Sequence, residues 1–194
     1  ACNRYTDGLQ NPNLTLADLS LADIQDKLSE SFVRQLDKMF MCGNHGDPAA
    51  SKHALDVYAW FRKINPSITL GMNTNGAIKT ESWWKQLGSM LNRETDYVVF
   101  SIDGLEDTNH IYRRNVDWQR LMTNVKSFIS AGGKAQWDML VFKHNEHQIE
   151  AAQSLAKSMG FVDFRCKVSK RARTWTQGIR SEEHTSELQS RETI

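Results

Sequence analysis

The stretch DYVVFSIDG, Asp96 to Gly104, decides the fold class of this chain. Its first half is an apolar run of β-branched and aromatic residues, which predicts the clearest strand in the sequence. The run ends on Ser101, Asp103 and Gly104, so polar side chains and a turn glycine follow the strand directly. This combination predicts a strand that delivers polar groups to one edge of a sheet.

Further strands and helices alternate on both sides of this stretch. The alternation, at roughly 25 to 40 residues per unit, indicates βαβ units and a parallel sheet. An open doubly wound sheet and a full or partial barrel both fit the pattern, and in either one ligands bind at the carboxyl ends of the strands. The other predicted strands are 38–42, 68–76, 135–142 and 161–167, and the predicted helices are 49–63, 81–91, 118–131 and 146–159, with one more inside 14–32.

Composition places the chain in the soluble globular class. It has 194 residues, 24 Lys and Arg against 23 Asp and Glu, and 40% hydrophobic residues, which suits one domain. No stretch approaches the roughly 18 to 20 apolar residues of a membrane span, and no leader is visible, so we expect a cytoplasmic protein. The three cysteines are far apart and odd in number, which argues against a disulfide framework. Basic and aromatic residues do not interleave as they do in nucleic-acid binders.

Both ends of the chain differ from what a complete reading frame would show. RSEEHTSELQS, Arg180 to Ser190, resembles the in-frame translation of a common sequencing adapter, so 180–194 is excluded from fold reasoning. The chain also starts on Ala1 without an initiator Met. We therefore expect a fragment, with a core domain at 1–175 and a tail at 176–194.

Polar side chains follow four of the predicted strands. Because parallel strands end at one edge of a sheet, these residues are expected to share a ligand site. The set is rich in amides and hydroxyls, which suits a polar organic ligand, and it lacks both the paired carboxylates of glycosidases and the nucleotide-binding Gly-x-x-x-x-Gly-Lys motif. Its members are Gly43, Asn44, His45, Gly46 and Asp47, then Asn73 to Gly76, then Ser101 and Asp103, then His144 and Asn145.

The order of these turns resembles the radical S-adenosylmethionine (SAM) superfamily. The resemblance is carried by CGNHGDP (42–48), NTNG (73–76), SIDGLEDTNHIYRR (101–114) and WDMLVFKHNEHQIEAA (137–152), and it covers nearly all of 2–171. It implies an α/β fold, a partial (β/α)6 TIM-like barrel of the radical SAM type without its first strand. It also implies an enzyme that cleaves SAM reductively to a 5'-deoxyadenosyl radical, which abstracts hydrogen from a substrate such as a peptide or small molecule.

The same resemblance implies a 4Fe-4S cluster, held in the family by Cys-x3-Cys-x2-Cys with one iron open to SAM. ACNRY resembles the last of these cysteines, so Cys2 is the expected cluster ligand. Its two companions would precede Ala1, and this chain is therefore expected to bind a cluster poorly. An electron donor such as a flavodoxin or ferredoxin is the implied partner.

For the first two turns, the resemblance implies contacts with SAM. Gly46, Asp47 and Pro48 match the family's Gly-Gly-Glu-Pro motif, which meets the SAM amino group. Asp replaces Glu here and is shorter by one methylene, so backbone carbonyls are expected to carry the contact. Asn73 and Asn75 are the candidates for hydrogen bonds to the ribose or the methionyl group.

For the third turn, Ser101 and Asp103 are expected to face the same ligand. An arginine after this turn grips the SAM carboxylate in several relatives, because a guanidinium binds a carboxylate bidentately. Arg113 is the first candidate and Arg114 the second. No residue is assigned a catalytic role.

Two other functions fit parts of the pattern. A metal-dependent hydrolase on a barrel would use His45, Asp47, Asp103, His110 and His144 as ligands. A non-catalytic barrel that binds a nucleoside would need only Asn75 and Ser101. Cys42 is interpreted as a residue packed in its strand, and the basic run 167–175 as a solvated strand end.

Overall fold

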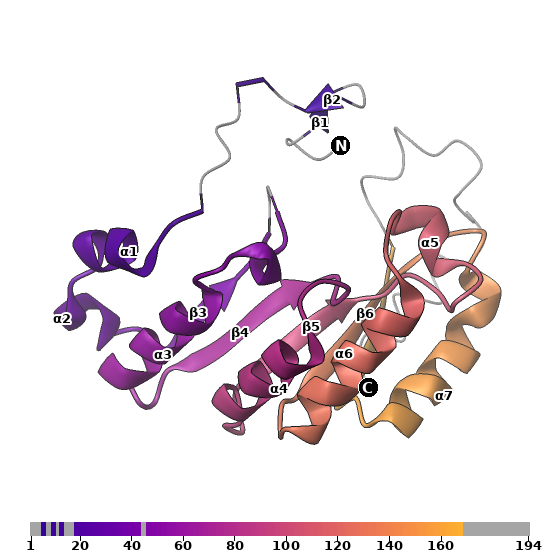
Figure 1. Ribbon diagram of the computed structural model, residues 1–194. Helices are drawn as coiled ribbons and strands as arrows, with labels where there is room; N and C mark the ends of the chain where they lie inside the picture. The colour runs from indigo at the N-terminus through magenta and orange to yellow at the C-terminus, as the bar shows by residue number, and fades with distance from the viewer. Residues whose placement is uncertain (1–4, 7–8, 11, 14–17, 44–45, 169–194) are drawn as a thin grey trace.

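The computed structural model describes residues 5–6, 9–10, 12–13, 18–43 and 46–168. In these ranges five parallel strands form one sheet in the order β3-β4-β5-β6-β7, which is also their order along the chain (Figure 1). The predicted α/β fold with a parallel sheet is thereby confirmed. The strands are β1 (Tyr5–Thr6) and β2 (Leu9–Gln10), which form a separate hairpin, then β3 (Lys38–Met41), β4 (Thr69–Thr74), β5 (Tyr97–Ser101), β6 (Ala135–Val141) and β7 (Asp163–Val168).

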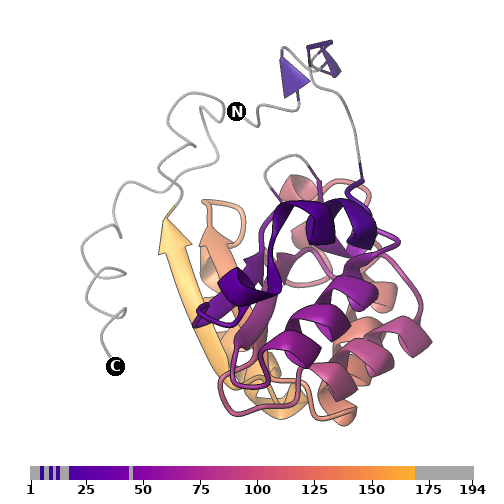
Figure 2. The same cartoon turned by 90° about the vertical axis from the view of Figure 1, so that its left-hand side faces the viewer.

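Helices connect the strands and cover one face of the sheet (Figures 1 and 2). None of the helices in the described ranges is long and apolar enough to cross a membrane. They are α1 (Leu21–Lys27), α2 (Glu30–Val33), η1 (Pro48–Ala50), α3 (Ala54–Ile64), α4 (Glu81–Met90), α5 (Asn109–Tyr112), α6 (Trp118–Ser130), η2 (Glu146–Gln148) and α7 (Ile149–Met159).

The two faces of the sheet differ in character because side chains alternate along each strand. In β6, Trp137 and Met139 are fully buried toward the helix layer, whereas Gln136 and Asp138, which alternate with them, are only partly buried. We call the face away from α3, α4, α6 and α7 the inner face.

An aromatic cluster joins the helix layer to the sheet. The ring of Trp84 in α4 lies 5.3 Å from that of Phe100 in β5 and 6.3 Å from that of Phe128 in α6. The Trp84 indole donates to the Ile78 carbonyl at 2.9 Å, so its polar atom is satisfied. A Cβ on Gly88 would stand 2.4 Å from the Phe128 carbonyl oxygen, so glycine lets α4 and α6 approach closely. Trp84 is thus a packing residue between the helix layer and the sheet.

The apolar pattern within 14–32 gives two short helices where the sequence predicts one. Ser20 and Asp23 form a capping box at the start of α1. Leu28 then takes an extended conformation, and the Ser29 side chain accepts a hydrogen bond from the Phe32 N–H and starts α2. A second N-cap serine therefore divides the predicted helix.

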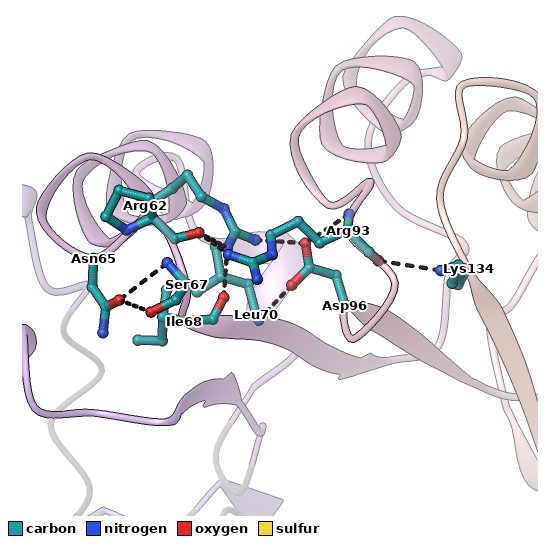
Figure 3. Close-up of polar contacts among 9 residues, drawn as sticks. Arg62, Asn65, Ser67, Ile68, Leu70, Arg93, Asp96 and Lys134 are labelled. Carbon is teal, nitrogen blue, oxygen red and sulfur yellow. Dashed lines mark hydrogen bonds and ion pairs between the residues drawn. The ribbon is translucent and has the colours of Figure 1, made fainter.

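A buried carboxylate organises the end of the sheet where the strands begin (Figure 3). Asp96 is fully buried just before β5, and its Oδ2 lies 2.5 Å from Arg62 Nη2 of α3. Its Oδ1 accepts the N–H of Leu70 in β4 at 2.9 Å, and Oδ2 also accepts the N–H of Arg93 at 3.2 Å. One side chain therefore joins α3, β4 and the loop before β5.

Candidate functional site

The turn after β3 is fastened to the end of β4 by Asp47. Its Oδ1 accepts the backbone N–H of Ala49 at 2.9 Å and caps η1. The Thr74 hydroxyl lies 2.9 and 3.0 Å from the two carboxylate oxygens, and the N–H of Asn75 donates to Oδ2 at 2.6 Å. Both carboxylate oxygens of Asp47 accept hydrogen bonds from protein donors, so the side chain positions the turn.

We expect Asp47→Ala to lower the free energy of unfolding by about 2 kcal/mol, because it removes an N-cap and two further hydrogen bonds to a charged acceptor. Urea unfolding followed by tryptophan fluorescence measures this loss. Thr74→Val provides the partner for a double-mutant cycle. Strictly additive effects of the two substitutions would show that the contact contributes nothing.

Two asparagines project from the end of β4. Asn73 is exposed, and its Nδ2 lies 3.6 Å from Cys42 Sγ. Asn75 is half-buried, and its Oδ1 accepts the N–H of Ala77 at 3.0 Å. The prediction that Cys42 packs within its strand is wrong: β3 ends at Met41, and the thiol is exposed beside Asn73.

In the third turn, the two predicted residues Asp103 and Arg113 form an ion pair. Arg113 Nε donates to Asp103 Oδ2 at 2.6 Å, and the side chain of Asp103 is fully buried. Its Oδ1 accepts the N–H of Leu140 at 2.6 Å. Burial raises the pKa of Asp103, and the guanidinium of Arg113 opposes that rise. Asp103 thus fixes the arginine at the edge of the sheet.

Three polar residues hold this third turn in shape: Asn145, which the sequence predicts at the site, and Asn109 and Gln148, which it does not. Asn109 Oδ1 accepts the Asp103 N–H at 2.8 Å, and Asn145 Nδ2 donates to the Asp103 carbonyl at 2.9 Å. Gln148 Oε1 accepts the N–H of Leu105 at 2.9 Å and the hydroxyl of Thr108 at 2.5 Å. Asn109 and Gln148 carry no local signal beyond their polar side chains, because their hydrogen-bond partners lie up to 43 residues away in the sequence.

His144 follows β6 with neither ring nitrogen paired among the described residues. Both nitrogens are buried, and the imidazole stacks on Phe142 with ring centroids 5.3 Å apart. Burial lowers the pKa of His144, Asp103 acts to raise it, and His147 acts to lower it. The imidazole is therefore held in its neutral form near neutral pH.

The lowered pKa of His144 predicts a pH dependence of stability. Because the unfolded state takes up a proton on this residue at a higher pH than the folded state, stability falls as the pH drops below about 6.5. We expect the loss between pH 7 and pH 5 to be smaller in His144→Gln. Denaturation midpoints measured at both pH values decide this, and identical losses in the two proteins would contradict it.

The sheet brings the predicted residues of β4 and β5 side by side. The register pairs Asn73 with Val99 and Thr74 with Phe100, so Asn75 and Ser101 follow on neighbouring strands about 4.8 Å apart. Ser101 is half-buried at the end of β5. The described residues of the candidate site are Gly46, Asp47 and Pro48 in the first turn, Asn73 and Asn75 in the second, and Ser101, Asp103 and Arg113 in the third. Cys2 and His45 lie outside the described residues.

The ligand set of a metal-dependent hydrolase does not assemble in the part of the chain that the structure describes. There, no group of three or more His, Cys, Asp or Glu side chains is placed to hold a metal ion. Asp47 and Asp103 are instead occupied by protein donors. In the described residues these two carboxylates therefore serve the protein's own donors.

No family model and no curated protein sequence matches the chain. Solved structures share its fold. SuiB of Streptococcus suis bound to S-adenosylmethionine has a TM-score of 0.62 and 16% identity over 80% of this chain and 36% of SuiB. SuiB bound to precursor peptide SuiA has a TM-score of 0.62 and 17% identity, over 81% of this chain and 34% of SuiB. A structure of anSMEcpe with bound AdoMet and a Kp18Cys peptide has a TM-score of 0.52 and 14% identity, over 73% of this chain and 42% of anSMEcpe.

These similarities confirm the fold. The chain spans about a third of the length of SuiB, and its fold matches the partial barrel that the family resemblance implies.

Proposed function

We propose that this chain binds S-adenosylmethionine at the carboxyl ends of β3, β4 and β5 and is part of a radical SAM enzyme. One observation carries the proposal: three consecutive parallel strands end in polar turns whose donors and acceptors meet at one edge of the sheet. The fold shared with SuiB, one structure of which holds S-adenosylmethionine, supports the choice of ligand.

Each turn has a role in this proposal. Within 46–48, the Gly46 carbonyl accepts the amino group of SAM, since the Asp47 carboxylate is committed to Thr74 and Asn75 and the carbonyls of Asp47 and Pro48 accept backbone N–H groups of the next turn. Arg113, held by Asp103, attracts the SAM carboxylate. Asn75 and Ser101 bind the ribose hydroxyls. The donor set of this chain thus fits the polar groups of SAM.

The residues present do not fit a 4Fe-4S cluster. The chain has three cysteines, without the Cys-x3-Cys-x2-Cys spacing. Two of them, Cys42 and Cys166, lie in the described part, where no three-ligand group occurs. Cys2 is a proposed ligand of a set that this sequence does not complete.

SAM binding tests the proposal directly. Titration calorimetry is expected to show binding, and Asn75→Ala is expected to weaken it about fivefold to tenfold, because one hydrogen bond contributes about 1 kcal/mol. Asn92→Ala, exposed in the loop before β5, is the matched control and should leave the affinity unchanged. Absence of any SAM binding by the wild-type chain would sink the proposal.

Reductive cleavage of SAM needs three cluster cysteines, and the three cysteines of this sequence do not have the Cys-x3-Cys-x2-Cys spacing. We propose that 1–175 belongs to the core domain of an enzyme that acts on a peptide and receives electrons from a flavodoxin or ferredoxin. Expression of the extended frame without oxygen, reconstitution with iron and sulfide, and reduction should yield methionine and 5'-deoxyadenosine. A protein that holds iron and sulfide yet cleaves no SAM would contradict this assignment.

A further inference from the structure

The inner face of β6 and β7 carries a charged cluster outside the candidate SAM site. The register pairs Ser101 of β5 with Asp138 of β6, and Asp138 with Arg165 of β7. Lys167 lies two residues further along β7 and therefore shares this face with Arg165. Neighbouring strands are about 4.8 Å apart, so Arg165 stands about 10 Å from Ser101 in the same row.

Two cations share one carboxylate in this cluster. Arg165 Nε and Nη2 each lie 2.7 Å from Asp138 Oδ1, and Lys167 Nζ lies 2.5 Å from Asp138 Oδ2. The three groups sum to one positive charge. Asp163, which is 43% exposed on the same face, lies 3.6 Å from Arg165 Nε, so with it the four groups are neutral together. Lys167 lies at the opposite end of β7 from this second acid.

The exposure of these groups decides what a ligand meets. The Asp138 side chain is 15% exposed, whereas those of Arg165 and Lys167 are 39% and 46% exposed. Asp138 is thus covered, while the two cations and Asp163 remain accessible. A ligand that approaches this face at the Lys167 end, away from Asp163, meets two accessible cations, and a carboxylate there would gain charge-assisted hydrogen bonds. The interpretation of Lys167 as part of a solvated strand end is therefore incomplete.

We propose that Arg165 and Lys167 anchor a carboxylate side chain of a peptide substrate beside the SAM site. The identification of this ligand as the substrate rests on the proposed function, and the anion site itself does not. Asp138 is a positioning residue that holds the two cations parallel on the inner face. Asp138 also competes with the ligand for these cations, so its removal is expected to strengthen ligand binding.

Two fluorescent peptide libraries test the anchor without knowledge of the natural substrate. Both have five residues with random flanks, and the central residue is glutamate in one and glutamine in the other. We expect the full chain to bind the glutamate library at least fivefold more tightly in fluorescence anisotropy. Lys167→Met and Arg165→Gln should abolish this preference, whereas Lys85→Met, an exposed lysine of α4, should retain it.

The variant Asp138→Asn distinguishes two hypotheses: that the cluster is an anion site, and that it is a salt bridge that only stabilises the sheet. The anchor predicts tighter binding of the glutamate library by about threefold to tenfold, because a competing charge is removed. A merely structural pair predicts weaker or unchanged binding. Circular dichroism establishes that each variant is folded, and Lys167→Gln serves as the second variant if Lys167→Met fails to fold.

SAM titration of the same proteins distinguishes the two proposals. Equal binding of both libraries by a wild-type chain that binds SAM overturns the anchor and leaves the proposed function standing. A glutamate preference in a chain that binds no SAM supports the anion site and removes the proposed function.

Discussion

Replacement of Asp96 by alanine is expected to lower the free energy of unfolding by about 3 to 5 kcal/mol, the range for breaking a buried ion pair. The substitution strips Arg62 of its carboxylate and leaves the buried N–H of Leu70 without its acceptor. Arg62 keeps its bond to the Ile68 carbonyl but no anionic partner at this end of the sheet (Figure 3). Urea unfolding monitored by circular dichroism measures the loss.

The matched control for Asp96 is Asp26→Ala in α1. Asp26 is 82% exposed and lies 3.8 Å from Lys27, so its removal should cost less than about 0.5 kcal/mol. Asp96→Asn keeps an oxygen acceptor and should lie between the two. A loss below about 1 kcal/mol for Asp96→Ala would show that the buried carboxylate does not hold α3, β4 and β5 together.

The second large effect is expected at the other end of the sheet, with Asp103→Ala. It removes the partner of Arg113 and the acceptor of the Leu140 N–H, so we expect a loss of about 3 kcal/mol. Because Arg113 is then no longer held, SAM affinity should fall at least tenfold. Urea unfolding and SAM titration give the two values on the same protein.

Glu106→Ala is the control for Asp103 in the same turn. Glu106 is exposed and its contact with Gln119 is at the surface, so both stability and SAM affinity should stay near those of the wild type. Asp103→Asn adds a further distinction. It retains an oxygen acceptor for Leu140 but loses the charge, so SAM affinity should fall more than stability. Loss of stability with unchanged SAM affinity would assign Asp103 to the fold alone.

Local pattern was sufficient for the strands of the sheet. DYVVFSIDG is rich in residues that favour strands, and the observed β5, Tyr97–Ser101, falls within it. The helix break at Leu28 was not predicted, because an apolar stripe continues across it and the deciding signal is the N-cap Ser29. Periodicity identifies the buried residues and is less informative about where one helix ends.

The candidate site was predictable as a location and not as a set of contacts. The carboxyl ends of parallel strands converge by geometry, so Asn75 and Ser101 could be placed together from their order alone. The commitment of Asp47 to Thr74, and of Asp103 to Leu140, depends on side-chain reach between segments far apart in sequence. No local spacing encodes those distances.

The order of the sheet also bears on how the protein is made. Each of the strands β4 to β7 pairs with the strand that precedes it in the chain, so its partner has already been synthesised. Short sequence separation keeps the entropic cost of closing each loop low. During translation, each new strand from β4 to β7 can pair with a strand that has already been synthesised. The sheet can therefore grow one strand at a time in the direction of synthesis.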